Sequence, residues 1–147
     1  MFDLLKKLLD GAPEPAREDP EAVTAVAALL VEAARSDAAY EPEEAATIER
    51  LLRELFGFDE TAARAARAEG ERAQAGAADL VRFTRVLKSE FSEGERVGLM
   101  EALWAVALTD GERDPHEDAL LRKLAPLIAV SDRDSAEARR RVAARLA

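Results

Sequence analysis

Apolar side chains recur every three or four residues along most of the chain after residue 20, the spacing that places them on one face of a helix. Ile48, Leu51 and Leu55 are one such series. No stretch alternates with the period of two that marks a half-buried strand. The pattern predicts an all-α fold, a single-domain helical bundle of about seven helices.

Capping residues, prolines and glycines mark where these helices begin and end. Proline follows the expected cap at Pro20 and Pro42, and Gly57 is typical of a helix end. The predicted helices begin near residues 20, 42, 59, 79, 92, 114 and 134. The expected N-terminal caps are Asp19, Glu41, Asp59, Asp79, Ser92 and Asp114. The third helix is rich in alanine, and we expect it to fade between residues 70 and 76.

The first part of the chain differs from the rest. Residues 2–9 have the pattern of a short amphipathic helix, and residues 11–19 contain two prolines and several charges, as a linker does. We therefore expect an N-terminal amphipathic segment and linker at residues 1–19 and a helical domain at residues 20–147.

An acidic corner between two helices occurs twice. Asp37 is followed by Pro five residues later and by Glu44 seven residues later, and Asp110 is followed by Pro115 and Glu117 at the same spacings. The shift from 37 to 110 also superimposes the apolar stripes of the flanking helices. We expect two related helical hairpins packed about a pseudo-twofold axis, with the middle helices as the crossover.

The four acids of these corners extend apolar stripes. Asp37 and Asp110 continue the stripe before each corner, and Glu44 and Glu117 lead the stripe after it. A carboxylate drawn toward an apolar layer is costly unless it is paired, capped or bound to a metal. A purely local explanation is open: the two Glu residues fall at the third helical position, where an acid accepts backbone N–H groups, and Asp110 could form a turn with Gly111.

The other explanation is a divalent cation shared by both corners. Oxygen-only ligands favour a hard ion such as Ca²⁺, Mg²⁺ or Mn²⁺. Glu112 and Asp114 are candidate auxiliary ligands, although the second corner alone does not follow the EF-hand pattern, which would need Glu where Leu121 stands. The expected metal ligands are Asp37, Glu44, Asp110 and Glu117.

Composition excludes several function classes. The net charge of −9 argues against sequence-independent nucleic-acid binding. Because the chain has no cysteine, it has no disulfide, thiolate metal site or cysteine nucleophile. No apolar run approaches the roughly 20 residues of a membrane span, and the N-terminus does not have the pattern of a signal peptide, so we expect a cytoplasmic protein.

No catalytic constellation is present in the sequence. His116 is the only histidine, and beside Pro115 in a first helical turn it is expected to be exposed. Trp104 and Phe83 are expected in the core. The arginine-rich final helix, residues 134–146, is typical of a solvated face and is also suited to an acidic partner.

The two corners resemble those of the TerB-like tellurite-resistance family. The resemblance rests on Leu-Thr-Asp-Gly at 108–111 and Arg-Ser-Asp-Ala at 35–38, each followed by Pro and Glu, with Ala38 where the family prefers Gly. It covers roughly residues 23–130 and extends to the N-terminal domain of DjlA-type co-chaperones. It implies an all-helical domain of two related halves, with the acidic residues proposed as a metal site. In this chain those residues are Asp37, Glu44, Asp110 and Glu117.

We therefore expect a non-enzymatic, TerB-like protein of a stress-response system that binds a divalent cation or a protein partner. Tellurite reduction calls for thiols or a redox cofactor, and the sequence contains no motif for either. The main alternative is a metal-free interaction scaffold whose N-terminal segment docks on a membrane surface or a partner helix. The simpler expectation for that segment is ordinary packing against the bundle. A metal-dependent hydrolase would need an open coordination position and a nearby acid or base.

Overall fold

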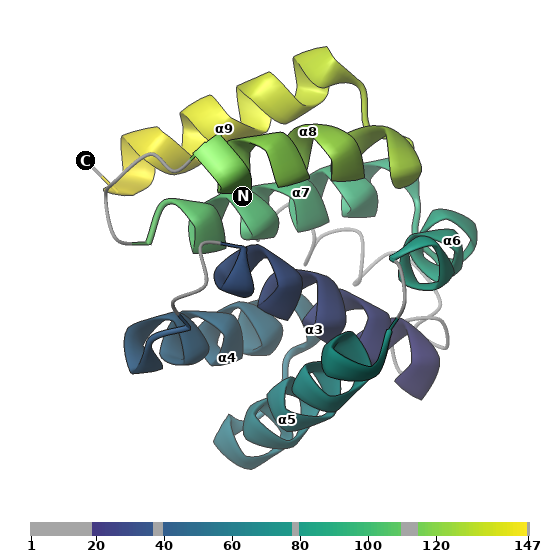
Figure 1. Cartoon of the computed structure of the whole chain (residues 1–147), viewed down its shortest axis with the longest axis vertical. Helices are drawn as coiled ribbons and strands as arrows, with labels where there is room; N and C mark the ends of the chain where they lie inside the picture. Colours follow the sequence, from purple (N-terminus) through teal and green to yellow (C-terminus); the bar gives the residue numbers. More distant parts are fainter. Residues whose placement is uncertain (1–18, 37–39, 78–79, 110–114, 147) are drawn as a thin grey trace.

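The computed structural model describes residues 19–36, 40–77, 80–109 and 115–146, and these residues form helices and their connections without a strand (Figure 1). The helices of this part of the chain are α3 (Pro20–Arg35), α4 (Pro42–Phe56), α5 (Glu60–Gly76), α6 (Val81–Glu90), α7 (Glu93–Ala107), α8 (Pro115–Leu127) and α9 (Asp132–Leu146). The predicted all-α bundle of about seven helices is confirmed. The pseudo-twofold relation between its halves stays a prediction.

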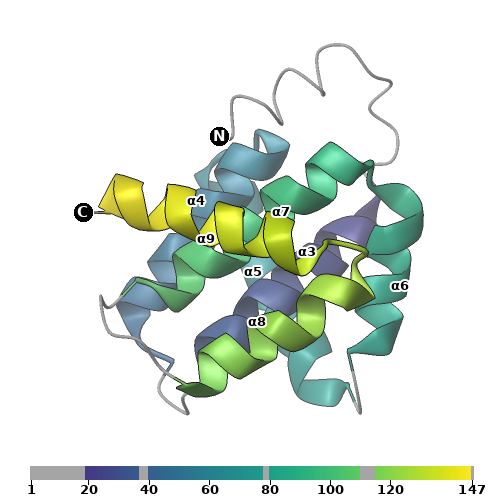
Figure 2. The ribbon, with the colours of Figure 1, turned by 90° about the horizontal axis from the view of Figure 1, so that it is seen from above.

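Helix α3 is the central element of the bundle. It contacts α4, α5, α6, α7 and α8, and Figures 1 and 2 show it between the α4–α5 pair and the α7–α8–α9 layer. Eleven of its 16 residues are buried. Leu29 and Val31 lie off the apolar stripe that the spacing of Val26, Leu30 and Ala33 predicts, and they are nevertheless fully buried. The sequence pattern indicated one buried face, whereas neighbours on several sides bury most of the helix.

Small residues bring α5 close to α3. A Cβ atom added to Gly70 would lie 2.5 Å from the Cβ of Ala27, far inside normal contact distance. Helix α5 continues through Gly70 to Gly76, the far end of the predicted range, and Gly70 lies at its contact with α3. Glycine destabilises a helix relative to alanine, and the close packing of α5 on α3 offsets this cost.

Helix α9 covers α7 on the side away from α3. Glu101 of α7 is 3 % exposed and accepts from Arg141 at 3.1 Å and from Arg145 at 3.4 Å, both in α9. The helix starts at Asp132, two residues before the predicted start. Ser131 precedes this start, and its hydroxyl accepts from the Asp134 backbone at 3.0 Å.

Most predicted helix starts agree with the structure. Asp19 and Asp59 cap α3 and α5, and Ser92 forms a capping box with Glu95 at the start of α7. The predicted caps Asp79 and Asp114 lie outside the described residues. Helix α6 begins at Val81. Phe83 is buried, as predicted, and Leu87 is buried beside it in the same helix.

Candidate functional site

The four helix ends that flank the two acidic corners lie on one side of the molecule. Figures 1 and 2 agree that the C-terminal ends of α3 and α7 and the N-terminal ends of α4 and α8 face the same way. The helices that precede the corners, α3 and α7, are in direct contact. The predicted ligands Asp37 and Asp110, and the auxiliary candidates Glu112 and Asp114, lie outside the described residues.

Glu44 of the first corner is a buried capping residue. Its side chain is at the third position of α4, after Glu41 at the cap and Pro42 at the first position. One carboxylate oxygen accepts the Glu41 backbone N–H at 3.0 Å. The sequence analysis offered backbone capping as a local explanation for this acid, and the hydrogen bond confirms it for Glu44. The same position places the carboxylate near the positive end of the helix dipole.

Glu117 of the second corner occupies the matching place in the first turn of α8. It is 2 % exposed, against 7 % for Glu44. Both side chains are therefore drawn into the protein, as their positions on the apolar stripes predict. His116, the residue before Glu117, is exposed, in agreement with its sequence context.

A complete metal centre is not formed by the described residues alone. Among residues 19–36, 40–77, 80–109 and 115–146, no group of three or more His, Asp or Glu side chains is placed to hold a metal ion. Two of the four predicted ligands, Glu44 and Glu117, belong to this part. The metal site therefore stays a prediction.

A polar network beside the first corner was not anticipated from the sequence. The Tyr40 hydroxyl donates to Glu71 of α5 at 2.6 Å, and Arg67 of α5 donates to Glu49 of α4 at 2.6 Å and also to Glu71. The network joins the residue that leads into α4 with the middle of α5. Burial and the hydrogen bond to Glu71 raise the pKa of Tyr40 to about 12.

A second set of contacts holds the C-terminal end of α3. The Arg35 guanidinium lies over the Tyr40 ring, 5.1 Å from its centroid, and donates to Gln74 at 2.5 Å. Gln74 in turn donates to Glu32 at 2.9 Å. Of these polar contacts, the sequence could have predicted the pair of Arg67 and Glu71, which are four residues apart on one helix. Contacts between different helices have no such spacing in the sequence.

The second half has a comparable anchor between α7 and α9. The indole N–H of Trp104 donates to the Ser135 hydroxyl at 3.1 Å, and the Arg139 guanidinium lies 5.5 Å from the indole ring centroid. Trp104 is a buried residue, as predicted. The final helix is therefore packed on the bundle through specific polar contacts as well as through Ala138 and Val142.

None of the helices in the described ranges has the length and apolar character needed to cross a membrane.

Comparison with known proteins identifies the family. A family model described as "Tellurite resistance protein TerB" matches residues 23–140. A search of the curated proteins found no match, and a search of the solved structures found none either. The matched residues span α4 to α8 completely, together with most of α3 and the first part of α9. The chain therefore belongs to the TerB family.

Proposed function

We propose that this protein is a non-enzymatic, cytoplasmic stress-response protein that binds a divalent cation through its two acidic corners and acts through a protein partner. Membership of the TerB family supports a tellurite-resistance-like function. The observation that carries the proposal is the matching burial of Glu44 and Glu117, one at the start of each helix that follows a corner. The proposed ligands are Asp37, Glu44, Asp110 and Glu117.

The donor set fits a hard cation. The proposed ligands are carboxylates, the ligand type that Ca²⁺, Mg²⁺ and Mn²⁺ prefer, and the chain has no cysteine to favour a softer ion. The capping bond of Glu44 uses one acceptor direction of one oxygen, whereas a carboxylate offers about four. Capping and ligation are therefore chemically compatible at this residue.

The arrangement of the helices supports a site shared by the two halves. Since the helix ends flanking the corners face the same side, carboxylates from α4 and α8 can converge there with those of the corners themselves. Carboxylates gathered in one place repel one another, and a bound cation relieves this repulsion. Ion binding would then hold the α3–α4 corner against the α7–α8 corner and organise that surface for a partner.

Thermal unfolding with and without Ca²⁺, Mg²⁺, Mn²⁺ or Zn²⁺ tests the proposal. At a free concentration of 100 times Kd, binding should stabilise the folded state by about 2.7 kcal/mol, which raises Tm by roughly 5–10 °C. Asp110→Asn and Glu117→Gln should abolish this rise. If no metal changes Tm in the unaltered protein, the cation proposal is wrong.

Glu95→Gln supplies a matched control. Glu95, like Glu44, is 7 % exposed and caps its own helix, with one oxygen accepting the Ser92 backbone N–H at 2.9 Å. It lies at the start of α7, whereas the second corner follows the end of that 15-residue helix, which is about 22 Å long. Glu44→Gln should remove the metal-dependent rise in Tm, and Glu95→Gln should leave it intact.

The alternative is a metal-free interaction scaffold. The observation that favours it is the capping bond of Glu44, which accounts for a buried carboxylate without an ion. In this case Glu44→Gln and Glu95→Gln lower Tm by similar amounts, and added metal changes neither variant nor the unaltered protein.

A further inference from the structure

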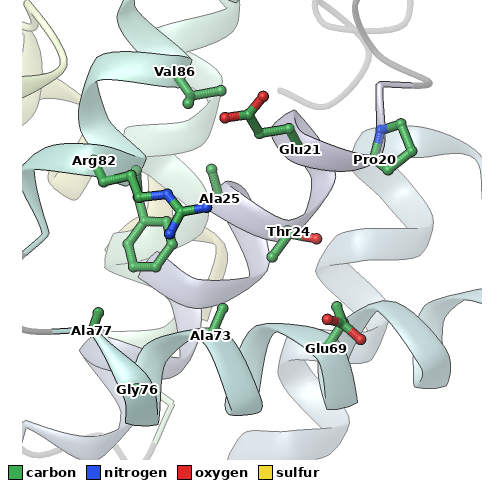
Figure 3. A pocket seen from close by; sticks show the side chains of 11 residues that line it. Pro20, Glu21, Thr24, Ala25, Glu69, Ala73, Gly76, Ala77, Arg82 and Val86 are labelled. Atoms are coloured by element: carbon green, nitrogen blue, oxygen red, sulfur yellow. The ribbon is translucent and has the colours of Figure 1, made fainter.

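An open groove lies between α3, α5 and α6, remote in the chain from both acidic corners. It has a volume of about 610 Å³ and is lined by the first turns of α3, the second half of α5 and the start of α6 (Figure 3). This volume is within the range of pockets that bind drug-sized ligands. The groove is formed by described residues only.

The groove has an apolar floor of small residues and a charged rim. Ala25, Ala73 and Ala77 are small lining residues, and Phe83 and Val86 add larger apolar surface. The rim residues are Pro20, Glu21, Thr24, Glu69 and Arg82. In Figure 3 Arg82 extends from α6 toward α3, with Glu21 and Glu69 on neighbouring helices. A shallow apolar trough with charges along its edges is the surface on which an amphipathic helix docks.

We propose that the groove binds an amphipathic helix and that its occupant is the chain's own N-terminal segment, residues 2–9. These residues lie outside the described part of the chain; their sequence and the place where they join the domain favour them as the occupant. Phe2, Leu5 and Leu9 follow the i, i+3, i+7 spacing of the anchors in helix-in-groove complexes.

The connection between segment and groove favours docking within one chain. Pro20 lines the groove, and only ten residues, 10–19, separate it from the end of the segment. Residues 10–19 span at most about 35 Å when extended, which exceeds the length of about 25 Å of the 17-residue α5. Residues 2–9 can therefore reach any part of the groove. A link of this short length also sets a high effective concentration of the segment, near the millimolar range.

Charges at the two surfaces are complementary. The segment carries Lys6 and Lys7 against one acid, Asp3, so its net charge is positive. The rim carries Glu21 and Glu69 against one base, Arg82, so its net charge is negative. An isolated helix of this length is marginal in water, so the segment needs a surface to be helical. Docking covers the apolar floor of the groove and the apolar face of the segment at the same time.

Paramagnetic relaxation in the full-length protein tests this inference. Because the chain has no cysteine, Asp3→Cys places a single nitroxide label at the end of the segment that is distant from the linker. We expect loss of amide signals from residues 69–77 and from the first turn of α6, with the signals of α8 and α9 retained. Signals that are uniformly retained, or lost first at α8 or α9, would overturn the inference.

Matched variants show whether the signal loss comes from docking of the segment in the groove. Ala73→Arg fills the groove and should restore the lost signals, whereas Ala75→Arg, at an exposed site of the same helix, should leave the loss unchanged. Leu5→Ser alters only the segment and should give the same result as Ala73→Arg, which separates docking from a folding defect.

Mixing labelled chains with isotope-enriched unlabelled chains shows whether a second copy is the occupant. Signal loss in the enriched chains means that the segment docks between molecules, which overturns the proposal. Vesicles containing phosphatidylserine test the membrane alternative. If residues 2–9 lose their signals only after these vesicles are added, and the groove signals are unaffected, the segment binds a membrane surface and the proposal is overturned.

Discussion

Gly70 of α5 rests directly on Ala27 of α3, at a distance that leaves no room for a methyl group. This close crossing lies within an extensive contact between α3 and α5. Small residues here allow the helix backbones to approach.

Gly70→Ala is therefore expected to destabilise the fold by about 1–3 kcal/mol, because the added Cβ forces the helices apart. Gly98→Ala is the matched control: Gly98 lies within α7, and among the described residues an added Cβ meets no atom within 4 Å beyond the neighbouring backbone of its own helix. It should stabilise the protein by about 0.5–1 kcal/mol through helix propensity. Urea unfolding followed by circular dichroism measures both changes. Equal effects of the two substitutions would contradict the close-contact interpretation.

Glu101→Gln should weaken the attachment of α9. The buried carboxylate accepts hydrogen bonds from two arginines whose side chains are 46 % and 42 % exposed, so solvent reduces the gain from the pair. We expect a loss of about 1–2 kcal/mol in the free energy of unfolding. Glu137→Gln removes the exposed pair with Arg133 in the same helix and should change stability by less than about 0.5 kcal/mol.

The Tyr40 hydroxyl should lose its proton at a higher pH than an ordinary tyrosine does. Its pKa is raised to about 12, first by burial and then by the hydrogen bond to Glu71. A pKa raised in the folded state means that the associated stability is fully present below pH 10 and is lost as the pH rises from 10 to 12. Since Tyr40 is the only tyrosine, phenolate absorbance reports it directly.

Glu71→Gln tests the cause of this shift. The substitution removes the negative charge beside the hydroxyl, so the midpoint of the absorbance change should move down toward 10. Glu54→Gln, in an exposed pair with Arg50, should not move it. An unchanged midpoint in Glu71→Gln would mean that burial alone sets the pKa.

Ser135→Ala should leave the indole N–H of Trp104 without its acceptor in a buried site. We expect a cost of about 1–3 kcal/mol, the usual penalty for a buried donor that loses its partner. The fluorescence of the single tryptophan gives the unfolding transition. Ser89→Ala, at an exposed serine of α6, is the control and should stay within about 0.5 kcal/mol of the parent.

Local sequence signals predicted local structure well. The caps at Asp19 and Asp59 and the capping box of Ser92 with Glu95 depend on neighbouring residues, so they could be found without a fold. The capping of α4 was likewise weighed from the position of Glu44 relative to Pro42. The predicted start of α9 was two residues late, within the usual uncertainty of helix ends.

Contacts between helices were beyond the reach of the sequence pattern. Nothing in the local sequence links Tyr40 to Glu71, or Glu101 to Arg141, because these partners are 31 and 40 residues apart. The burial of α3 was underestimated for the same reason: periodicity identifies one apolar face, whereas neighbours on several sides decide how much of a helix is covered.

The amino-acid sequence by itself determined that this chain is all-helical, where most of its helices begin, and that Glu44 and Glu117 are directed inward, because these properties follow from spacing along one helix. Only the tertiary structure decided that α3 is the central helix, that Gly70 is a packing contact, and that a groove opens between α3, α5 and α6. These features arise where side chains from distant parts of the chain pack together and are buried from water. The free energy of this burial depends on which residues are neighbours in space, and the local sequence does not specify them.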